Sequence, residues 1–239
     1  MKIIILNTTQ YKESDIIINA ISEEGPVSFK VRGAAKQNSA FAWLNNRLVI
    51  ADVEYVENVR YIHQILKNAK LITFPISDKF KYENIIAINL ANEAMERLLQ
   101  DEEKHLMFKY LEGYVNYVKE AKDPILGVLI FLGKILKVAG YELEVNKCIY
   151  CGSTKNIKAF SFAEGGFICG DCLSEEIMYD LTTDQMKLVR AVLNRENYDN
   201  LQAADVSDID KKVLLTKFRD FIKDGLGVEL GSINLILKN

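Results

Sequence analysis

The first third of the chain alternates between apolar and polar positions, as β-strands do. In residues 27–33 the positions Val27, Phe29 and Val31 are apolar, whereas the residues between them are polar or charged. Together with a short apolar run at residues 3–6 and an Ile-rich run at 15–21, this pattern predicts five short strands, at residues 3–6, 15–21, 27–33, 48–57 and 59–66. Several short strands with long connections predict a small barrel or a sandwich.

From about residue 79 the apolar residues recur at helical spacing instead. Pro124 suits a first helical turn, Gly140 suits a helix end, and Thr182 opens a capping-box sequence. The predicted helices cover residues 80–100, 105–122, 125–139, 182–193 and 207–223. Strands followed by helices predict an α+β protein.

All four cysteines lie in one short segment, as two pairs that each enclose two residues. Cys148 pairs with Cys151, and after 17 residues Cys169 pairs with Cys172. This spacing is typical of a tetrahedral Zn²⁺ site, and a strand, a Gly-rich turn and a second strand between the pairs predict a zinc ribbon. Four thiolates leave no open coordination position, so we expect one structural Zn²⁺ per chain. The alternative is four unligated thiols clustered by chance.

A second candidate site is a basic stretch between residues 27 and 47. It contains four cations and no acid, giving it a charge of +4 against −3 for the whole chain. Its candidate DNA-contacting residues are Lys30, Arg32, Lys36 and Arg47 for phosphates, and Phe41 and Trp43 for stacking on bases. The alternative is a solvated surface, with the two aromatic residues closing the end of the barrel.

Composition limits the remaining possibilities. Hydrophobic residues make up 49% of the chain, which is enough for a core, and the net charge of −3 excludes a polybasic binder. Residues 127–134 are not a P-loop, because five residues separate the glycines and Ile135 replaces the Ser or Thr that binds Mg²⁺. We find no catalytic motif and expect no enzyme. Without a signal peptide or membrane span, we expect a cytoplasmic, nucleoid-associated protein.

Several short motifs resemble, in order and spacing, the bacterial recombination mediator family RecO. Residues 11–17 (YKESDII) are similar to its "Y-x-E-S-D-x-I" opening, and residues 31–34 (VRGA) resemble its "(K/R)GA" strand and loop. Residues 130–152 are similar to its "LL…G(F/Y)…C-x-x-CG" passage, and residues 160–172 match its "F…GG…C…C" ending.

The resemblance covers essentially the whole chain and implies both a fold and a function. The implied fold is an N-terminal OB-fold barrel (residues 1–78), an α-helical domain (79–147 and 173–239) and an inserted zinc module (148–172). The implied function is non-enzymatic DNA repair: binding of single- and double-stranded DNA and annealing of complementary strands. The implied partners are RecR, the acidic C-terminal tail of the single-strand-binding protein and, indirectly, RecA.

Two other functions compete with this interpretation. A zinc-stabilised protein–protein adaptor without direct DNA binding is favoured by the net charge, and it predicts that acids such as Asp52 and Glu54 screen the basic face. A zinc enzyme acting on nucleic acid would require an open zinc shell and a nearby base.

Overall fold

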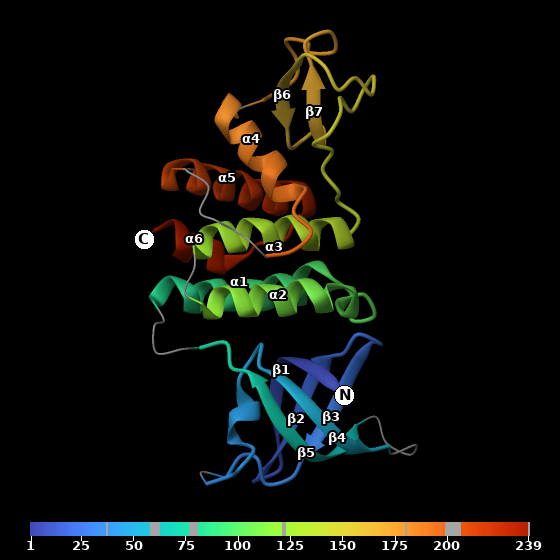
Figure 1. The fold of residues 1–239 in the computed structure, drawn as a ribbon, viewed down its shortest axis with the longest axis vertical. Coiled ribbons are helices and arrows are strands. Elements are labelled where there is room, and N and C mark those ends of the chain that lie inside the picture. The colour runs from blue at the N-terminus through green and yellow to red at the C-terminus, as the bar shows by residue number, and fades with distance from the viewer. Residues whose placement is uncertain are drawn as a thin grey trace. The chain divides into compact units, whose positions relative to one another are not determined.

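The computed structural model describes residues 1–36, 38–57, 63–76, 81–120, 123–179, 181–198 and 207–238. The chain forms two compact units, one of residues 1–88 and 99–122 and the other of residues 89–98 and 123–239 (Figure 1). The predicted domain boundary at residues 78 and 79 lies outside the described residues. The three-part division of the chain therefore stays a prediction.

The first unit contains a closed barrel with the strand order β1-β2-β3-β5-β4 (Figure 1). Its strands are β1 (Lys2–Tyr11), β2 (Asp15–Ile21), β3 (Pro26–Val31), β4 (Ile50–Val56) and β5 (Gln64–Thr73). Strand β1 pairs antiparallel with both β2 and β4, and β3 closes the barrel by running parallel to β5. A five-stranded barrel of this kind is an OB-fold, so the predicted fold class is confirmed.

The barrel has a hydrophobic core of its own, built by the alternation visible in the sequence. Phe29 and Val31 are 0% and 1% exposed, as predicted, and Val27 packs against the same core. The short helix η1 (Ala42–Asn45) contacts β1 and β2 and adds the buried Leu44. The barrel therefore folds around apolar side chains and leaves its charged residues outside.

Two strands extend beyond their predicted ends. Strand β1 continues to Tyr11, and β5 continues to Thr73 through several exposed, partly charged positions. Backbone pairing with β4 holds this part of β5, whose polar side chains hide its strand character. Residues 59–62 of the predicted fifth strand lie outside the described residues.

The next elements are α1 (Tyr82–Leu98), the 3-10 turn η2 (Lys104–Met107) and α2 (Phe108–Lys119), near the predicted helices. The first unit includes η2, α2 and α1 up to residue 88, whereas residues 89–98 of α1 belong to the second unit. Predicted end residues 80, 121 and 122 lie outside the described part of the chain. The Tyr114 hydroxyl donates to the carbonyl oxygen of Ala87 at 2.8 Å, which joins α2 to α1. Burial raises the pKa of Tyr114, so the phenol stays neutral.

The second unit is built around one almost fully buried helix. Its helices are α3 (Pro124–Val138), α4 (Thr183–Leu193), α5 (Asp208–Asp220), the π-helical turn η3 (Phe221–Gly225) and α6 (Gly231–Leu237). Helix α3 packs against α4 and α5, and every residue from Leu126 to Leu136 is buried. The Asp123 carboxylate caps α3 by accepting from the Leu126 N–H at 3.0 Å, and it also pairs with Lys211 of α5.

Helix α6 was not predicted. The sequence interpretation ended the last helix at Gly225 and Gly227, but a further seven-residue helix follows. Glu93 of α1 holds its start, because the carboxylate accepts from the N–H groups of Gly231 and Ser232 at 2.9 and 3.0 Å. Tertiary contacts therefore stabilise a helix that is too short to form alone.

Strands β6 (Ile157–Ser161) and β7 (Gly166–Cys169) form the predicted ribbon between the cysteine pairs. Glu144 bridges to Gly166 beside this hairpin. A side chain at Gly166 would come within 2.4 Å of the Glu144 carbonyl oxygen, so this position requires glycine. Phe162 continues the ribbon's aromatic contacts to Phe218 of α5, with ring centroids 5.4 Å apart.

Candidate functional site

The four predicted metal ligands come together. Cys148 and Cys151 precede the ribbon, Cys169 ends β7, and Cys172 follows in the next turn. Their sulfur atoms all lie within 4.8 Å of one another, and the Sγ atoms of Cys151 and Cys169 are 3.6 Å apart. Ligands at about 2.3 Å around a tetrahedral Zn²⁺ would be ~3.8 Å apart. The cluster therefore has the ligand set and the size for one metal ion.

The backbone around the cluster favours a thiolate at Cys148. Burial of this side chain raises its pKa, but hydrogen bonds from the backbone of Cys169, Cys151 and Tyr150 outweigh burial and lower the pKa to about 6. Cys172 behaves in the opposite way, because contacts with Cys151 and then Cys169 raise the pKa of its thiol to about 12. An anionic sulfur beside neutral thiols suits a cation that displaces the remaining protons on binding.

Neither histidine joins the cysteine cluster. The Nδ1 atom of His63 lies 2.8 Å from the Ser28 hydroxyl on the barrel, and that of His105 lies 2.7 Å from the carbonyl oxygen of Glu102. Among the described residues, the cysteines are the one group of His, Cys, Asp or Glu side chains close enough together to hold an ion. Four thiols converging on one point fill a tetrahedral shell, as in a structural metal site.

The predicted DNA-contacting residues come from β3 and from the segment that connects it to β4. Lys30 is on β3, and Arg32 and Lys36 lie in the β3–η1 loop (residues 32–41, of which residue 37 lies outside the described part). This loop is at the same end of the barrel as the β1–β2 turn, because the Ala35 N–H donates to the Ser14 carbonyl oxygen at 2.9 Å. Arg47 follows η1.

Lys30 does not present a free charge. Its Nζ atom lies 3.1 Å from Oδ2 of Asp15 on the neighbouring strand β2, and 4.5 Å from the ring centre of Tyr11. By contrast, Arg32, Lys36 and Arg47 are exposed and form no ion pair with any described residue. Three of the four predicted cations are therefore exposed and without an ion-pair partner among the described side chains.

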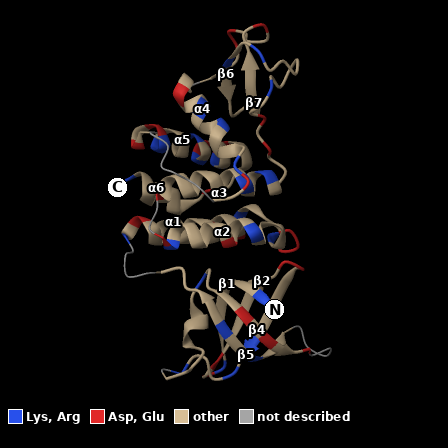
Figure 2. Ribbon diagram, in the orientation of Figure 1, with Lys and Arg blue, Asp and Glu red and all other residues tan. Residues whose placement is uncertain are grey.

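Asp52, one of the acids named by the adaptor hypothesis, has other partners than Lys30. Asp52 lies on β4, which pairs with β1 and β5 and not with β3, and Asp52 faces Lys70 across the strands. Its carboxylate accepts a 2.9 Å hydrogen bond from the N-terminal amine, which lowers the pKa of Asp52. The acid beside Lys30 is Asp15. Figure 2 shows basic and acidic segments together on the barrel strands.

The two predicted stacking residues are only partly available. Phe41 and Trp43 are half-buried and pack against the barrel core, around the start of η1. Tyr11 was not among the predicted contacts, but the residue is 39% exposed and its ring lies beside Lys30. The neighbouring Lys12 is the local signal that could have marked it, since single-strand-binding surfaces combine basic and aromatic side chains.

Comparison with known proteins identifies the family. The family model described as "Recombination protein O C terminal" matches residues 79–233, and "Recombination protein O N terminal" matches residues 1–73. The chain belongs to the recombination protein O family. It is thus a member of a DNA repair and recombination family whose N-terminal part is the OB-fold barrel.

Relatives named "DNA repair protein RecO" match the chain at low identity over most of its length. The Halalkalibacterium halodurans protein is 25% identical and covers 78% of this chain and 74% of its own. The Thermoanaerobacter sp. protein is 23% identical and covers 98% and 94%, and the Bacillus mycoides protein is 28% identical and covers 95% and 92%. The predicted resemblance to RecO is confirmed.

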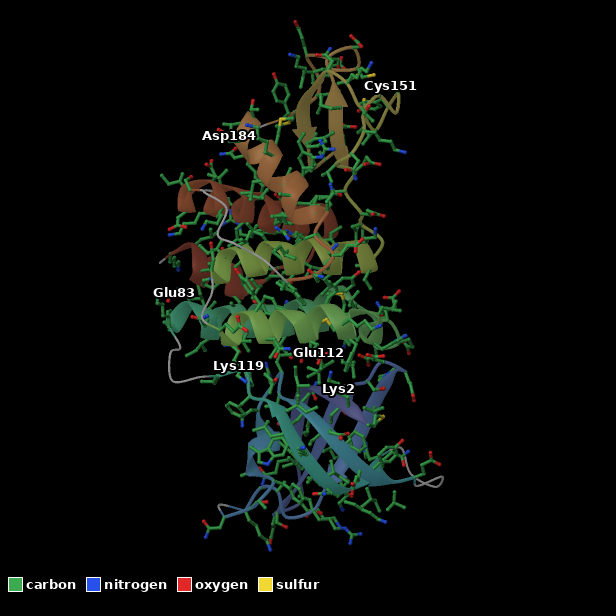
Figure 3. The ribbon with its side chains drawn as sticks, in the orientation of Figure 1. Lys2, Glu83, Glu112, Lys119, Cys151 and Asp184 are labelled. Carbon is green, nitrogen blue, oxygen red and sulfur yellow. The ribbon has the colours of Figure 1, made fainter. Side chains whose placement is uncertain are left out.

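This RecO-family chain combines a cysteine cluster with an OB-fold barrel that carries exposed cations. The cluster could hold a metal ion, and Figure 3 shows Cys151 beside the β6–β7 ribbon. Within the described part of the chain, no helix is both long and apolar enough to cross a membrane.

Proposed function

We propose that this chain is a non-enzymatic DNA-repair mediator. Its barrel would bind single- and double-stranded DNA and anneal complementary strands. With RecR, and through the acidic tail of the single-strand-binding protein, it would help to load RecA onto coated single strands. The observation that carries the proposal is the pair of exposed cations Arg32 and Lys36 beside β3, which have no ion-pair partner in the described part of the chain, on the OB-fold barrel of a DNA-repair family member.

Annealing follows from this arrangement by simple electrostatics. Cations that neutralise backbone phosphates reduce the repulsion between two strands and release counterions. They also leave the base edges free, because contacts to phosphate carry no sequence information. A basic loop on a barrel that also carries acidic side chains would hold strands weakly enough for them to pair with each other.

The test measures DNA binding at increasing salt concentrations, with the fluorescence anisotropy of a labelled single strand as the readout. We expect binding to weaken steeply with salt, and the variant Arg32→Ala/Lys36→Ala to flatten the slope by about 1.4, at ~0.7 per phosphate contact. The matched control is Lys155→Ala/Lys158→Ala, which removes two exposed cations from the ribbon segment. Equal slopes for the wild type and both variants would overturn the assignment of DNA binding to this loop.

We further propose that the cysteine cluster holds one structural Zn²⁺ per chain. Cys148, Cys151, Cys169 and Cys172 would all be ligands, and the ion would stabilise the ribbon without taking part in any reaction. Elemental analysis should find one zinc per chain, and cobalt substitution should give the spectrum of four thiolates. A substoichiometric metal content, or a spectrum showing a water ligand, would contradict this and revive the zinc-enzyme hypothesis.

The adaptor hypothesis has one observation in its favour, which is the ion pair between Lys30 and Asp15. If every cation of the barrel were neutralised in this way, no DNA binding would remain at low salt. The exposed Arg32 and Lys36 favour the mediator instead.

A further inference from the structure

The pair between Asp15 and Lys30 lies within the proposed DNA-binding surface. Strands β2 and β3 pair so that Ile17 faces Lys30, which brings Lys30 diagonally beside Asp15. The two side chains are only 16% and 26% exposed, with 3.1 Å between Oδ2 and Nζ. The ring centre of Tyr11, which faces Asp15 across β1 and β2, lies 4.5 Å from the ammonium group. Lys30 thus contacts both a carboxylate and an aromatic ring.

The two oxygens of Asp15 have different partners. While Oδ2 holds Lys30, Oδ1 accepts from the backbone N–H of Gly33 at 3.0 Å. Gly33 has a left-handed backbone conformation, with φ of +69°, and begins the turn of the β3–η1 loop. The Gly33 N–H and then Lys30 lower the pKa of Asp15, so it is an anion at neutral pH. One residue therefore positions the basic loop and neutralises a neighbouring cation.

We propose that Asp15 limits the affinity of this surface for DNA, because its carboxylate competes with a DNA phosphate for Lys30. The inference rests on the proposed function. A lysine ammonium is a compact charge on a flexible stem, and it can exchange one anion for another. In the free protein Lys30 contributes little net charge, which leaves Arg32 and Lys36 as the cations that first meet a strand. A phosphate contact that Asp15 weakens suits a protein that has to release its DNA strand.

The variant Asp15→Asn separates the two roles. An asparagine keeps an acceptor oxygen for the Gly33 N–H, but it has no charge to hold Lys30. We expect single-stranded DNA to bind about threefold more tightly at low salt, with a salt slope steeper by ~0.7, which corresponds to one added phosphate contact. The matched control is Asp52→Asn, which makes the same charge change on β4, where Asp52 holds the N-terminal amine.

A double-mutant cycle adds a readout that a purely structural role would not change. Lys30→Ala should leave the slope of the wild type nearly unchanged, but should flatten the slope of Asp15→Asn by about 0.7. Should Asp15→Asn not fold, Lys30→Met in the wild type gives an independent test. It should leave the salt slope of the wild type nearly unchanged, whereas Arg32→Ala should flatten it by about 0.7.

The possible failures are distinguishable. If the wild type binds DNA with a salt slope but Asp15→Asn binds no more tightly than Asp52→Asn, the inference is wrong and the proposed function stands. A salt slope that flattens as much in Lys30→Met as in Arg32→Ala would also overturn the inference. If neither the wild type nor Asp15→Asn binds DNA at low salt, the proposed function fails and the inference fails with it.

Discussion

The barrel and the cysteine ribbon are both small β-structures, but they are stabilised in different ways. Among the described residues, a cluster of thirteen buried side chains, including Phe29 and Leu44, lies inside the barrel. The cluster around the candidate metal ligands has four buried members, of which Cys148 and Cys169 are two. The barrel can therefore change its surface and keep its fold. In the ribbon the candidate metal ligands are part of the core, so the site and the fold depend on the same residues.

The same difference separates the roles that we assign to them. The charged residues of the barrel lie outside its core, where a DNA strand can reach Arg32 and Lys36. The sulfur atoms of the ribbon face one another and would enclose an ion. A surface that can change without unfolding is suited to binding, whereas a closed metal shell is suited to structure. The predictions below test this separation.

The largest expected effect is that of metal removal. Chelation, or the substitution Cys148→Ser, should unfold the ribbon, because structural zinc binding contributes about 10–16 kcal/mol in small modules. Hydrogen exchange should show loss of protection in β6 and β7, with β1 to β3 unchanged. The control Lys158→Ala changes an exposed ribbon side chain and should have no effect. Full protection of β6 and β7 without metal would show that the ribbon folds without it.

The converse perturbation targets the barrel. Phe29 is fully buried and its ring contacts Tyr55, with centroids 5.4 Å apart. Phe29→Ala should lower the free energy of unfolding of the barrel by ~3–5 kcal/mol. The metal content of this variant should stay at one ion per chain. The control Phe41→Ala changes a half-buried position and should destabilise the barrel less. Loss of metal in Phe29→Ala would show that the two regions are not independent.

A smaller effect is expected from Gly166→Ala in the ribbon. The added carbon would lie 2.4 Å from the backbone oxygen of Glu144, so the backbone would have to shift, at a cost of about 1–3 kcal/mol. Thermal unfolding and the rate of metal release should both reveal the change. The control Gly225→Ala meets its nearest neighbouring atom at an ordinary 3.5 Å. Equal melting temperatures for the two variants would contradict the steric account.

The smallest expected effect is on the pH dependence of the barrel's stability. The native pKa of Asp15 lies below its ordinary value of 3.8, so the unfolded chain binds more protons as the pH falls through this range. The stabilisation by Asp15 is therefore complete above its unfolded pKa and is lost as the pH drops through the native one. Urea unfolding should show less loss of stability on acidification in Asp15→Asn than in the wild type. Identical pH profiles would contradict the assignment.

Much of the fold follows from local patterns in the sequence. The alternation around Phe29 gives the inward face of β3, and Thr182 and Gln185 form the predicted capping box, with reciprocal hydrogen bonds of 3.3 and 3.0 Å. The cysteine spacing alone predicts the cluster at Cys148 to Cys172. In each case the residues that determine the feature are close together in the chain or repeat with one period.

The features that were missed depend on distant residues. Helix α6 forms because the Glu93 carboxylate accepts hydrogen bonds from the first N–H groups of the helix. Glu93 lies more than a hundred residues earlier in the chain. Lys30 is neutralised because the strand register brings Asp15 beside it, and no local pattern gives that register. The half-buried positions of Phe41 and Trp43 likewise result from the packing of η1 against the barrel.

The most direct test of this separation is hydrogen exchange of the metal-loaded chain with and without a short single strand of DNA. We predict added protection in the β1–β2 turn, in β3 and in residues 32–36, with the ribbon from Cys148 to Cys172 unchanged. Protection that appears in the ribbon and not in the barrel would contradict the account, because it would make the cysteine module the DNA-binding surface.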